Sequence, residues 1–241
     1  MISSFTLPRD KVEDFNIIKY IYKIEGKLQN LTPLRVGVGA EAGEFGGVDL
    51  AVIRLKGKPY IPASSLKGVF RSHLERVSTL KYGEENVHSP FDKDIEEREK
   101  ERVCAVCGIF GNITIASHVV IFNSLIEGTP SYHYKPGIAI SRKFASVAQG
   151  PFIEEYVEPG HLWTFHMEVI NINLEGDGED DPRPSLVKTL LQDLEKGTIQ
   201  VGGRKSIGAG LVRLISDKIR VLKTYPEDGE MIYDKEVKKP W

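Results

Sequence analysis

The residues best suited to chemistry follow a glycine-rich stretch that starts at Gly37. Gly46 and Gly47 lead through Val48 to Asp49. Glycine permits positive φ angles and close approach of the backbone to a large ligand, and successive exposed N–H groups can form an anion-binding concavity. The Asp49 carboxylate could hold a divalent cation beside a phosphate, where the metal would stabilise developing charge or help to deprotonate an adjacent hydroxyl. Asp49 could instead accept N–H bonds within its own turn. The stretch as a whole favours a phosphodiester ligand over a small neutral one.

Two cations lie one helical turn apart in the segment that comes next. Lys67 and Arg71 would project together from a helix and could bind successive phosphates, with an affinity that depends on salt and not on base sequence. The alternative is an ordinary charged helix face, because Glu75 stands four residues after Arg71. Arg76, farther along the same segment, is a weaker candidate.

A second glycine-rich turn repeats this combination near the end of the chain. Gly202 and Gly203 precede Arg204 and Lys205, and the turn ends at Gly210. Glycine again permits close approach of the backbone, and the two cations would neutralise phosphate. The alternative is a plain turn before a strand. Because four glycines in nine residues exceed what one turn needs, we expect Gly203, Arg204 and Lys205 to contact RNA.

Arg142, Lys143 and Phe144 place two cations beside an aromatic ring. A cation can hold a phosphate while an aromatic ring stacks on a base, so we expect Arg142 and Lys143 to bind RNA. An exposed aromatic residue at the tip of a hairpin could equally pack on a neighbouring subunit.

The two cysteines of the chain, Cys104 and Cys107, have the spacing of a zinc knuckle but supply only half of a tetrahedral site. His88 or His118 could complete it, and His88 is the candidate ligand that we carry forward. The alternative is a pair of buried thiols at the start of a helix or turn. A redox role is less favoured, because the flanking sequence is not thioredoxin-like.

Composition excludes several classes of protein. The 241 residues are 41% hydrophobic, enough to bury a substantial core as one elaborated domain or two small ones. A formal net charge of −2 supplies no global basic field, so RNA binding would have to rest on local clusters. No apolar run has membrane-spanning length and no secretory leader is recognisable. The sequence therefore indicates a soluble, cytoplasmic protein without a membrane partner.

Hydrophobic periodicity predicts the elements that would position these residues. Alternating or short apolar runs predict strands at 17–29, 50–53, 119–122, 163–169 and 211–215, with 34–36 continuing or pairing with the first. Helices are predicted after Pro62, with Ser64 or Ser65 as cap, and at 184–196. The resulting order of strand, helix, strand, strand, helix, strand is the ferredoxin-like plan of an α+β fold, which also builds the RNA-recognition motif.

Several of these motifs, taken in order, resemble the RAMP superfamily of CRISPR systems. They are Gly46–Asp49, the helix start at 62–68, Phe110–Gly111, Ile140–Arg142 and the turn at 202–210. The closest likeness is to the repeated backbone subunit of type III effector complexes, and it extends over roughly residues 17–215. The family often has an aspartate directly before the arginine that corresponds to Arg142, whereas this chain has Ser141 there.

The resemblance implies a single elaborated domain over 1–241, a modified RNA-recognition-motif fold with two insertions. A helical, zinc-knuckle-like insertion is expected at 81–117, and because residues 91–102 are mostly charged we expect that part to be solvated. A thumb-like hairpin is expected at 128–160, with Arg142 at its basic position. Some relatives hold zinc at the cysteine pair.

The resemblance also implies a function in antiviral defence. The chain would bind a CRISPR guide RNA, target single-stranded RNA, copies of itself and other effector subunits, and Asp49 would support Mg²⁺- or Mn²⁺-dependent cleavage of the target. One alternative is a scaffold subunit that binds RNA without cleaving it. Another is a stand-alone endoribonuclease that processes guide precursors, an activity that often uses a histidine base without metal.

Overall fold

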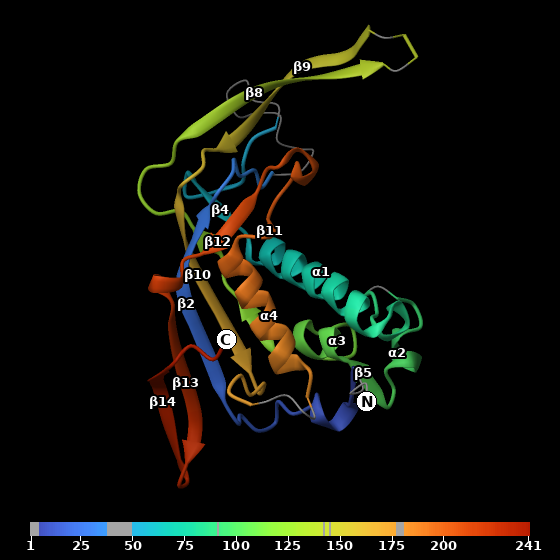
Figure 1. The fold of residues 1–241 in the computed structure, drawn as a ribbon, viewed down its shortest axis with the longest axis vertical. Helices are drawn as coiled ribbons and strands as arrows, with labels where there is room; N and C mark the ends of the chain where they lie inside the picture. The colour runs from blue at the N-terminus through green and yellow to red at the C-terminus, as the bar shows by residue number, and fades with distance from the viewer. Residues whose placement is uncertain (1–4, 38–49, 91, 142, 145, 177–180) are drawn as a thin grey trace.

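An antiparallel sheet with helices packed on one face forms the body of the protein in the computed structural model, and a long β-hairpin projects beyond it (Figure 1). The structure describes residues 5–37, 50–90, 92–141, 143–144, 146–176 and 181–241.

Four strands and two helices build this body in the predicted order. They are β2 (Ile21–Asn30), α1 (Ala63–Tyr82), β6 (Val119–Ile121), β10 (Leu162–Ile170), α4 (Arg183–Lys196) and β12 (Leu211–Leu214). Within the sheet the strands lie in the order β12, β2, β10, β6, and each neighbouring pair is antiparallel. This arrangement confirms the ferredoxin-like fold class. A short strand, β11 (Ile199–Gln200), extends the sheet beyond β12.

Alternation of side chains along β2 and β10 explains why the helices cover one face. Tyr22, Ile24 and Leu28 on β2 are fully buried, whereas the residues between them are only partly covered. On β10, Trp163 and Phe165 belong to the same buried set. Because successive strand residues point to opposite faces of a sheet, these side chains form one apolar layer. β2 starts at residue 21, later than the predicted 17.

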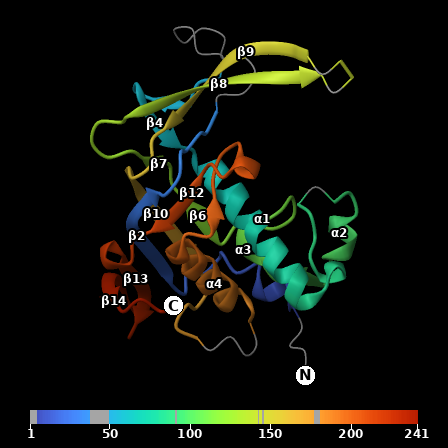
Figure 2. The same ribbon diagram turned by 45° about the horizontal axis from the view of Figure 1, so that its top comes forward.

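The two long helices pack on this layer, and the view turned by 45° shows α1 and α4 side by side in front of the sheet (Figure 2). On α1, Leu66, Phe70 and Leu74 are buried, and they repeat at the spacing of one helix face. The Phe70 ring meets the Phe165 ring edge-on, with 6.4 Å between centroids. Within the described residues no helix is long and apolar enough to cross a membrane.

The start of α1 differs from the prediction. Neither Ser64 nor Ser65 caps the helix, because α1 already begins at Ala63. The Ala63 N–H instead donates to Asn123 Oδ1 at 2.8 Å. Asn123 follows β6 and is distant in sequence, so this interaction could not be read from the helix itself.

The segment 81–117 folds against the helices. It contains α2 (Ile95–Arg98), β5 (Arg102–Cys104) and α3 (Ala105–Phe110), and β5 pairs with β1 (Thr6–Pro8) near the N-terminus. All six residues of α3 are buried, and Ile95 and Glu99 are also buried. The expectation that 91–102 is a solvated run was therefore wrong in part, because Ile95 and Glu99 are buried while most of the other described residues of this run are exposed.

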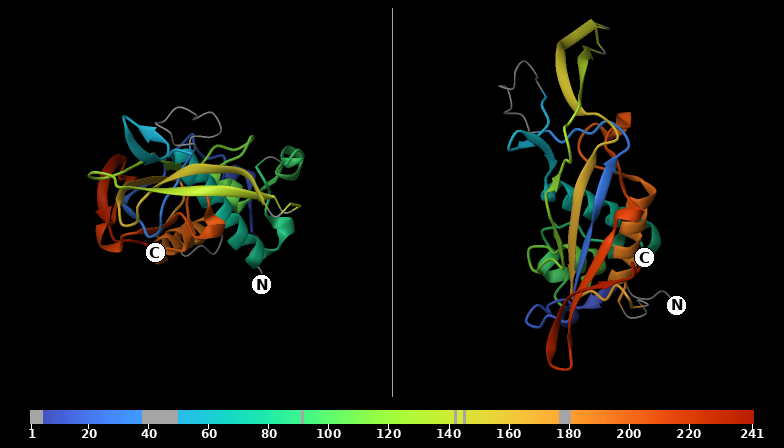
Figure 3. Two further views of the ribbon diagram at one scale, coloured as in Figure 1. Left: turned by 90° about the horizontal axis from the view of Figure 1, so that it is seen from above. Right: turned by 90° about the vertical axis from the view of Figure 1, so that its left-hand side faces the viewer.

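The long hairpin consists of β8 (Tyr132–Ser141) and β9 (Ser146–Val157). Seen from the side, it stands away from the sheet and helices (Figure 3). Leu34 and Val157 exchange two backbone hydrogen bonds, of 2.9 and 2.8 Å, at its base. A separate small sheet comprises β3 (Arg54–Leu55), β4 (Lys58–Ile61) and β7 (Ser124–Leu125).

A second hairpin, which the sequence patterns did not predict, follows β12. It comprises β13 (Arg220–Glu227) and β14 (Glu230–Val237), and β13 pairs with the first half of β2. Lys223 Nζ lies 5.1 Å from the centroid of the Tyr22 ring and 5.3 Å from that of Tyr225. The cation–π contact with Tyr22 joins the hairpin to β2, whereas the contact with Tyr225 lies within β13.

We predict that Phe70→Ala lowers the free energy of unfolding by about 3–5 kcal/mol, because it removes a fully buried ring between α1 and the sheet. Urea denaturation followed by circular dichroism measures the change. Leu80→Ala, on the same helix but at a side chain that is 90% exposed, should stay within about 0.5 kcal/mol of the wild type. Equal effects of the two substitutions would contradict the described packing of α1.

Candidate nucleic-acid interface

Some of the predicted RNA-contacting and catalytic residues lie outside the described part of the chain. These are Gly46, Gly47, Asp49 and Arg142. The description stops at Gly37 and resumes one residue after Asp49, so the two ends of the first glycine-rich stretch are known.

Both ends of this stretch are held by backbone pairing. Gly37 forms an antiparallel bridge with Val52. Leu50 N–H donates to the Ile153 carbonyl at 3.1 Å, and the Leu50 carbonyl accepts the Glu155 N–H at 3.1 Å. The predicted strand at 50–53 is therefore reduced to isolated bridges. Leu50, the first described residue after the glycine-rich stretch, therefore lies beside β9 at the base of the long hairpin.

The second glycine-rich turn packs directly on the residues that precede the first. Gly203 N–H donates to the Arg35 carbonyl at 2.9 Å, and Gly210 N–H donates to the Pro33 carbonyl at 2.9 Å. Gly202 has φ +83°, and a Cβ there would lie 2.2 Å from the Arg35 carbonyl oxygen. Positive φ and close approach both require glycine at this position. The second glycine turn therefore lies against the residues that lead into the first glycine-rich stretch.

A buried acid that sequence reasoning missed fixes Arg204 in this turn. Glu154 on β9 is 4% exposed, and its carboxylate pairs with Arg204 and accepts the Tyr156 hydroxyl hydrogen bond. Burial opposes ionisation of Glu154, but hydrogen bonds from Tyr156 and Arg204 outweigh it and lower its pKa. Burial and the Glu154 carboxylate raise the pKa of Tyr156 to about 12. Arg204 therefore ties the turn to the hairpin.

The next residue on β9, Glu155, makes a similar tie on the opposite face. It is 2% exposed, accepts the Val52 N–H at 3.0 Å and pairs with Arg54 at 2.5 Å. Because consecutive strand residues point in opposite directions, the two acids attach the hairpin base to different parts of the body. No local sequence pattern marks either acid, since their partners are distant in the chain.

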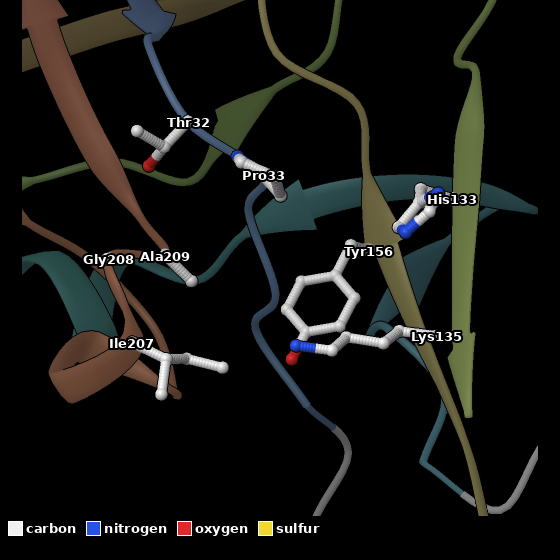
Figure 4. A pocket seen from close by; sticks show the side chains of 8 residues that line it. All are labelled: Thr32, Pro33, His133, Lys135, Tyr156, Ile207, Gly208 and Ala209. Atoms are coloured by element: carbon white, nitrogen blue, oxygen red, sulfur yellow. The ribbon is translucent and has the colours of Figure 1, made fainter. Parts of the chain in front are cut away.

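A hollow of about 350 Å³ lies between the hairpin base and the second glycine turn (Figure 4). Lys135 and Tyr156 of the hairpin border it on one side, and Ile207 of the turn on the other. Ile207 is 59% exposed although it is large and apolar. Lys135 supplies a cation that can neutralise a phosphate, and Ile207 supplies apolar surface that a base could cover.

The two cations predicted on α1 have different surroundings. Arg71 donates to Glu75 at 2.8 Å, to the Gly111 carbonyl at 2.5 Å and to Cys107 Sγ at 3.3 Å. The bonds to Gly111 and Cys107 tether α1 to the end of α3. The pair with Glu75, the alternative considered above, is present in the structure, and the phosphate contact of Arg71 stays a prediction. Lys67 is half-buried and forms no ion pair with a described residue. Burial and the charge of Arg71 lower the pKa of Lys67.

Lys143 and Phe144 lie in the connection between β8 and β9. Lys143 Nζ is 5.4 Å from the centroid of the Phe144 ring, and Phe144 is 71% exposed. An exposed aromatic ring with an adjacent cation can contact RNA or a neighbouring subunit, so both predicted roles stay open.

The two cysteines belong to a buried polar cluster. Candidate ligand atoms of His88, Glu99 and Cys104 all lie within 4.8 Å of one another. His88 Nδ1 is 2.9 Å from Glu99 Oε1, and Cys107 N–H donates to Cys104 Sγ at 3.3 Å. Glu99 was not predicted as a member of this cluster. His118, the alternative ligand, is bonded elsewhere, 3.1 Å from Asp14.

The charges of this cluster are strongly interdependent. Hydrogen bonds from Cys107 lower the pKa of Cys104 to about 7, whereas the hydrogen bond with Cys104, together with burial, raises the pKa of Cys107. Burial opposes ionisation of Glu99, but hydrogen bonds from His88 and the Cys104 N–H lower its pKa. The hydrogen bond to Glu99 raises the pKa of His88. Two sulfurs, an imidazole and a carboxylate match the ligands that zinc prefers.

We predict that Gly202→Ala disrupts the packing of the second glycine turn on Arg35 and costs well over 1 kcal/mol of stability, because the added methyl group collides with a backbone carbonyl. Gly208→Ala is the matched control. Gly208 has φ +84° but open space around its Cβ position, so that substitution should cost only about 1 kcal/mol of backbone strain. Thermal unfolding of both variants measures the difference, and equal losses would contradict the close approach at Gly202.

Comparison with known proteins identifies relatives of this chain. A family model described as the RAMP superfamily matches residues 27–213. A relative from Methanocaldococcus jannaschii, named CRISPR system Cms endoribonuclease Csm3, is 30% identical over 210 residues, which cover 81% of this chain and 79% of the relative.

A solved structure has a similar fold. It is a chain of the type III-B Cmr-beta complex bound to cognate target RNA, with a TM-score of 0.55 and 20% identity. The match covers 84% of this chain but only 61% of the length of that chain. Taken with the match of the family model over most of the chain, and with the ferredoxin-like strand order, these relationships show that the chain belongs to the RAMP superfamily.

Proposed function

We propose that this chain is a guide-RNA-binding backbone subunit of a type III CRISPR effector complex, and that it cleaves bound target RNA by metal-dependent chemistry. Membership of the RAMP superfamily supports this proposal, as does similarity to a relative named as an endoribonuclease. The solved neighbour is described as bound to target RNA. Partners would be guide RNA, target single-stranded RNA, further copies of the chain and other effector subunits, assembled in the cytoplasm.

The observation that carries the proposal is the contact, near the hairpin base, between the second glycine turn and the residues that lead into the first glycine-rich stretch. The Gly203 N–H bond to the Arg35 carbonyl brings the second turn against the chain that leads into the first. Glycine-rich backbone admits a nucleic-acid strand closely, and nearby Lys135 and Lys205 supply positive charge. Local cations suffice, because RNA need contact only one groove of a protein whose net charge is −2.

Specificity would come from base pairing between guide and target, with the protein reading backbone and shape. The cleavage step would depend on Asp49, which would hold a divalent cation such as Mg²⁺ or Mn²⁺. When bound, such an ion would stabilise the charge that develops at the scissile phosphate or help to activate the adjacent 2′-hydroxyl. A single aspartate supplies too few ligands for a divalent ion, so oxygens of the RNA and water would complete the coordination.

The hydrogen-bonding of two of the histidines argues against the alternative of a metal-independent processing nuclease. His118 is fully buried against Asp14, and His88 is bonded to Glu99. The scaffold alternative differs from the main proposal only at Asp49.

We predict that Asp49→Ala abolishes regularly spaced cleavage of guide-complementary, labelled RNA by the reconstituted complex, while RNA binding is retained. EDTA should have the same effect on the wild type. Glu44→Ala, which removes another acid of the same glycine-rich stretch, is the matched control and should still cleave. If Asp49→Ala cleaves normally, Asp49 has a structural role. If the wild type binds without cleaving, the chain is a scaffold, and cleavage in EDTA would favour the processing nuclease.

We further propose that Cys104, Cys107, His88 and Glu99 hold a zinc ion. The knuckle spacing of the cysteines and the gathering of His88 and Glu99 beside Cys104 support this ligand set. Bound zinc would join β5, α3 and the chain around α2. These segments are also held together by the hydrogen bonds that Glu99 accepts from the Cys104 N–H and from Asn112.

We predict that the purified protein carries about one zinc ion per chain by mass spectrometry, and that Co²⁺ substitution gives the absorption of thiolate-bound cobalt. Cys104→Ser and Glu99→Gln should lower the metal content, because each removes a ligand. Glu97→Gln, an exposed acid on α2, should leave it unchanged. A wild type without zinc, or a Cys104→Ser variant that keeps it, would contradict the proposal.

A further inference from the structure

Two cations from separate parts of the chain border a second hollow, on the other side of the second glycine turn. Arg76 comes from α1 and Lys205 from the turn, and the hollow between them has a volume of about 230 Å³. Ser72, Thr198 and Gln200 add polar groups to its lining. This hollow is distinct from the one at the hairpin base in Figure 4, whose lining includes neither cation.

No acid neutralises this pair of cations within the described residues. Arg76 makes one hydrogen bond there, from Nε to the Ser72 carbonyl of its own helix at 3.3 Å. Neither Arg76 nor Lys205 forms an ion pair with a described carboxylate. Asp193, which lies at the end of α4, is occupied by His73 at 3.0 Å and Lys196 at 3.1 Å. The hollow therefore carries uncompensated positive charge.

The electrostatics of Lys205 agree with this geometry. Partial burial lowers the pKa of Lys205, and the charge of Arg76 lowers it further. Two like charges that face one another without a counterion raise the free energy of the folded protein. An anion placed between them would remove that cost.

The groups around the hollow are held by regular elements. Gln200 Nε2 donates to the carbonyls of Lys205 and Ala209 at 3.0 and 2.9 Å, which fixes the turn that carries Lys205. Thr198 Oγ1 donates to the Asp193 carbonyl at the end of α4 at 3.0 Å. A site built on rigid elements binds its ligand at little cost in ordering.

We propose that Arg76 and Lys205 bind one phosphate group of the RNA backbone in this hollow, with Ser72, Thr198 and Gln200 around it. This assignment rests on the proposed function. It adds a phosphate contact on the α1 side of the second glycine turn, whereas Arg204 is turned to the hairpin by Glu154. The two consecutive cations of the turn thus have different roles: Arg204 attaches the hairpin, and Lys205 binds the phosphate.

The test compares Arg76→Gln, Lys205→Gln and the double variant with the wild type in the reconstituted complex. Lys81→Gln, an exposed cation on the last turn of α1, is the matched control. Guide-RNA affinity is measured over a range of NaCl concentrations for several unrelated RNA sequences. The double variant should bind about tenfold more weakly, by a similar factor for every sequence. The slope of log affinity against log salt should become shallower by about 0.7, the value for one phosphate of a single strand.

Thermal unfolding separates ligand binding from a structural role. Neutralising either cation should leave the melting temperature of the RNA-free protein unchanged or higher, because a like-charge repulsion is removed. Inorganic phosphate should raise the melting temperature of the wild type and of Lys81→Gln but not of the double variant. A lower melting temperature of the double variant, with RNA affinity that falls only in proportion to the unfolded fraction, would overturn the assignment.

The outcomes also distinguish this inference from the proposed function. A wild-type complex that binds no guide RNA would overturn both. A wild type that binds RNA, with a double variant of equal affinity and equal salt slope, would overturn the phosphate contact alone. If inorganic phosphate stabilises the wild type while RNA affinity does not depend on the two cations, the hollow takes a free anion and the RNA assignment is wrong.

Discussion

The hydrogen bond from Gly203 to the Arg35 carbonyl is the interaction on which the candidate interface depends. It places the second glycine turn on the chain that leaves β2, and the absence of a Cβ at Gly202 makes this approach possible. Once the turn is docked, Arg204 reaches the buried Glu154 of the hairpin and Lys205 faces α1. Hairpin, sheet and first helix are therefore arranged around one backbone contact.

The fold could largely be predicted from the sequence, because its main elements carry local signals. Leu66, Phe70 and Leu74 repeat at helical spacing, and Tyr22, Ile24 and Leu28 lie on one face of an alternating strand. Their order along the chain was enough to give the ferredoxin-like plan. The first insertion was harder, because its charged residues dominate the composition while the few residues that face the core, such as Ile95, determine where it packs.

The candidate site was only partly predictable, because several of its residues act through partners that are distant in the chain. Glu154 and Glu99 look like ordinary surface acids in sequence but are buried and hydrogen-bonded. Arg71 has the spacing of a phosphate ligand, yet three of its bonds go to protein groups on α1 and near α3. Glycine-rich turns could be recognised because glycine has a conformational meaning of its own, whereas a single charge has meaning only with its partner.

The base of the long hairpin is hydrogen-bonded to the chain on both sides of the first glycine-rich stretch. β9 exchanges backbone hydrogen bonds with Leu34 on one side of the first glycine-rich stretch and with Leu50 on the other. A rotation of the hairpin about its base must therefore carry Leu50 with it, unless these bonds break. A force applied far out on the hairpin, by whatever it touches, would be transmitted as displacement to the residue that directly follows Asp49 in the chain.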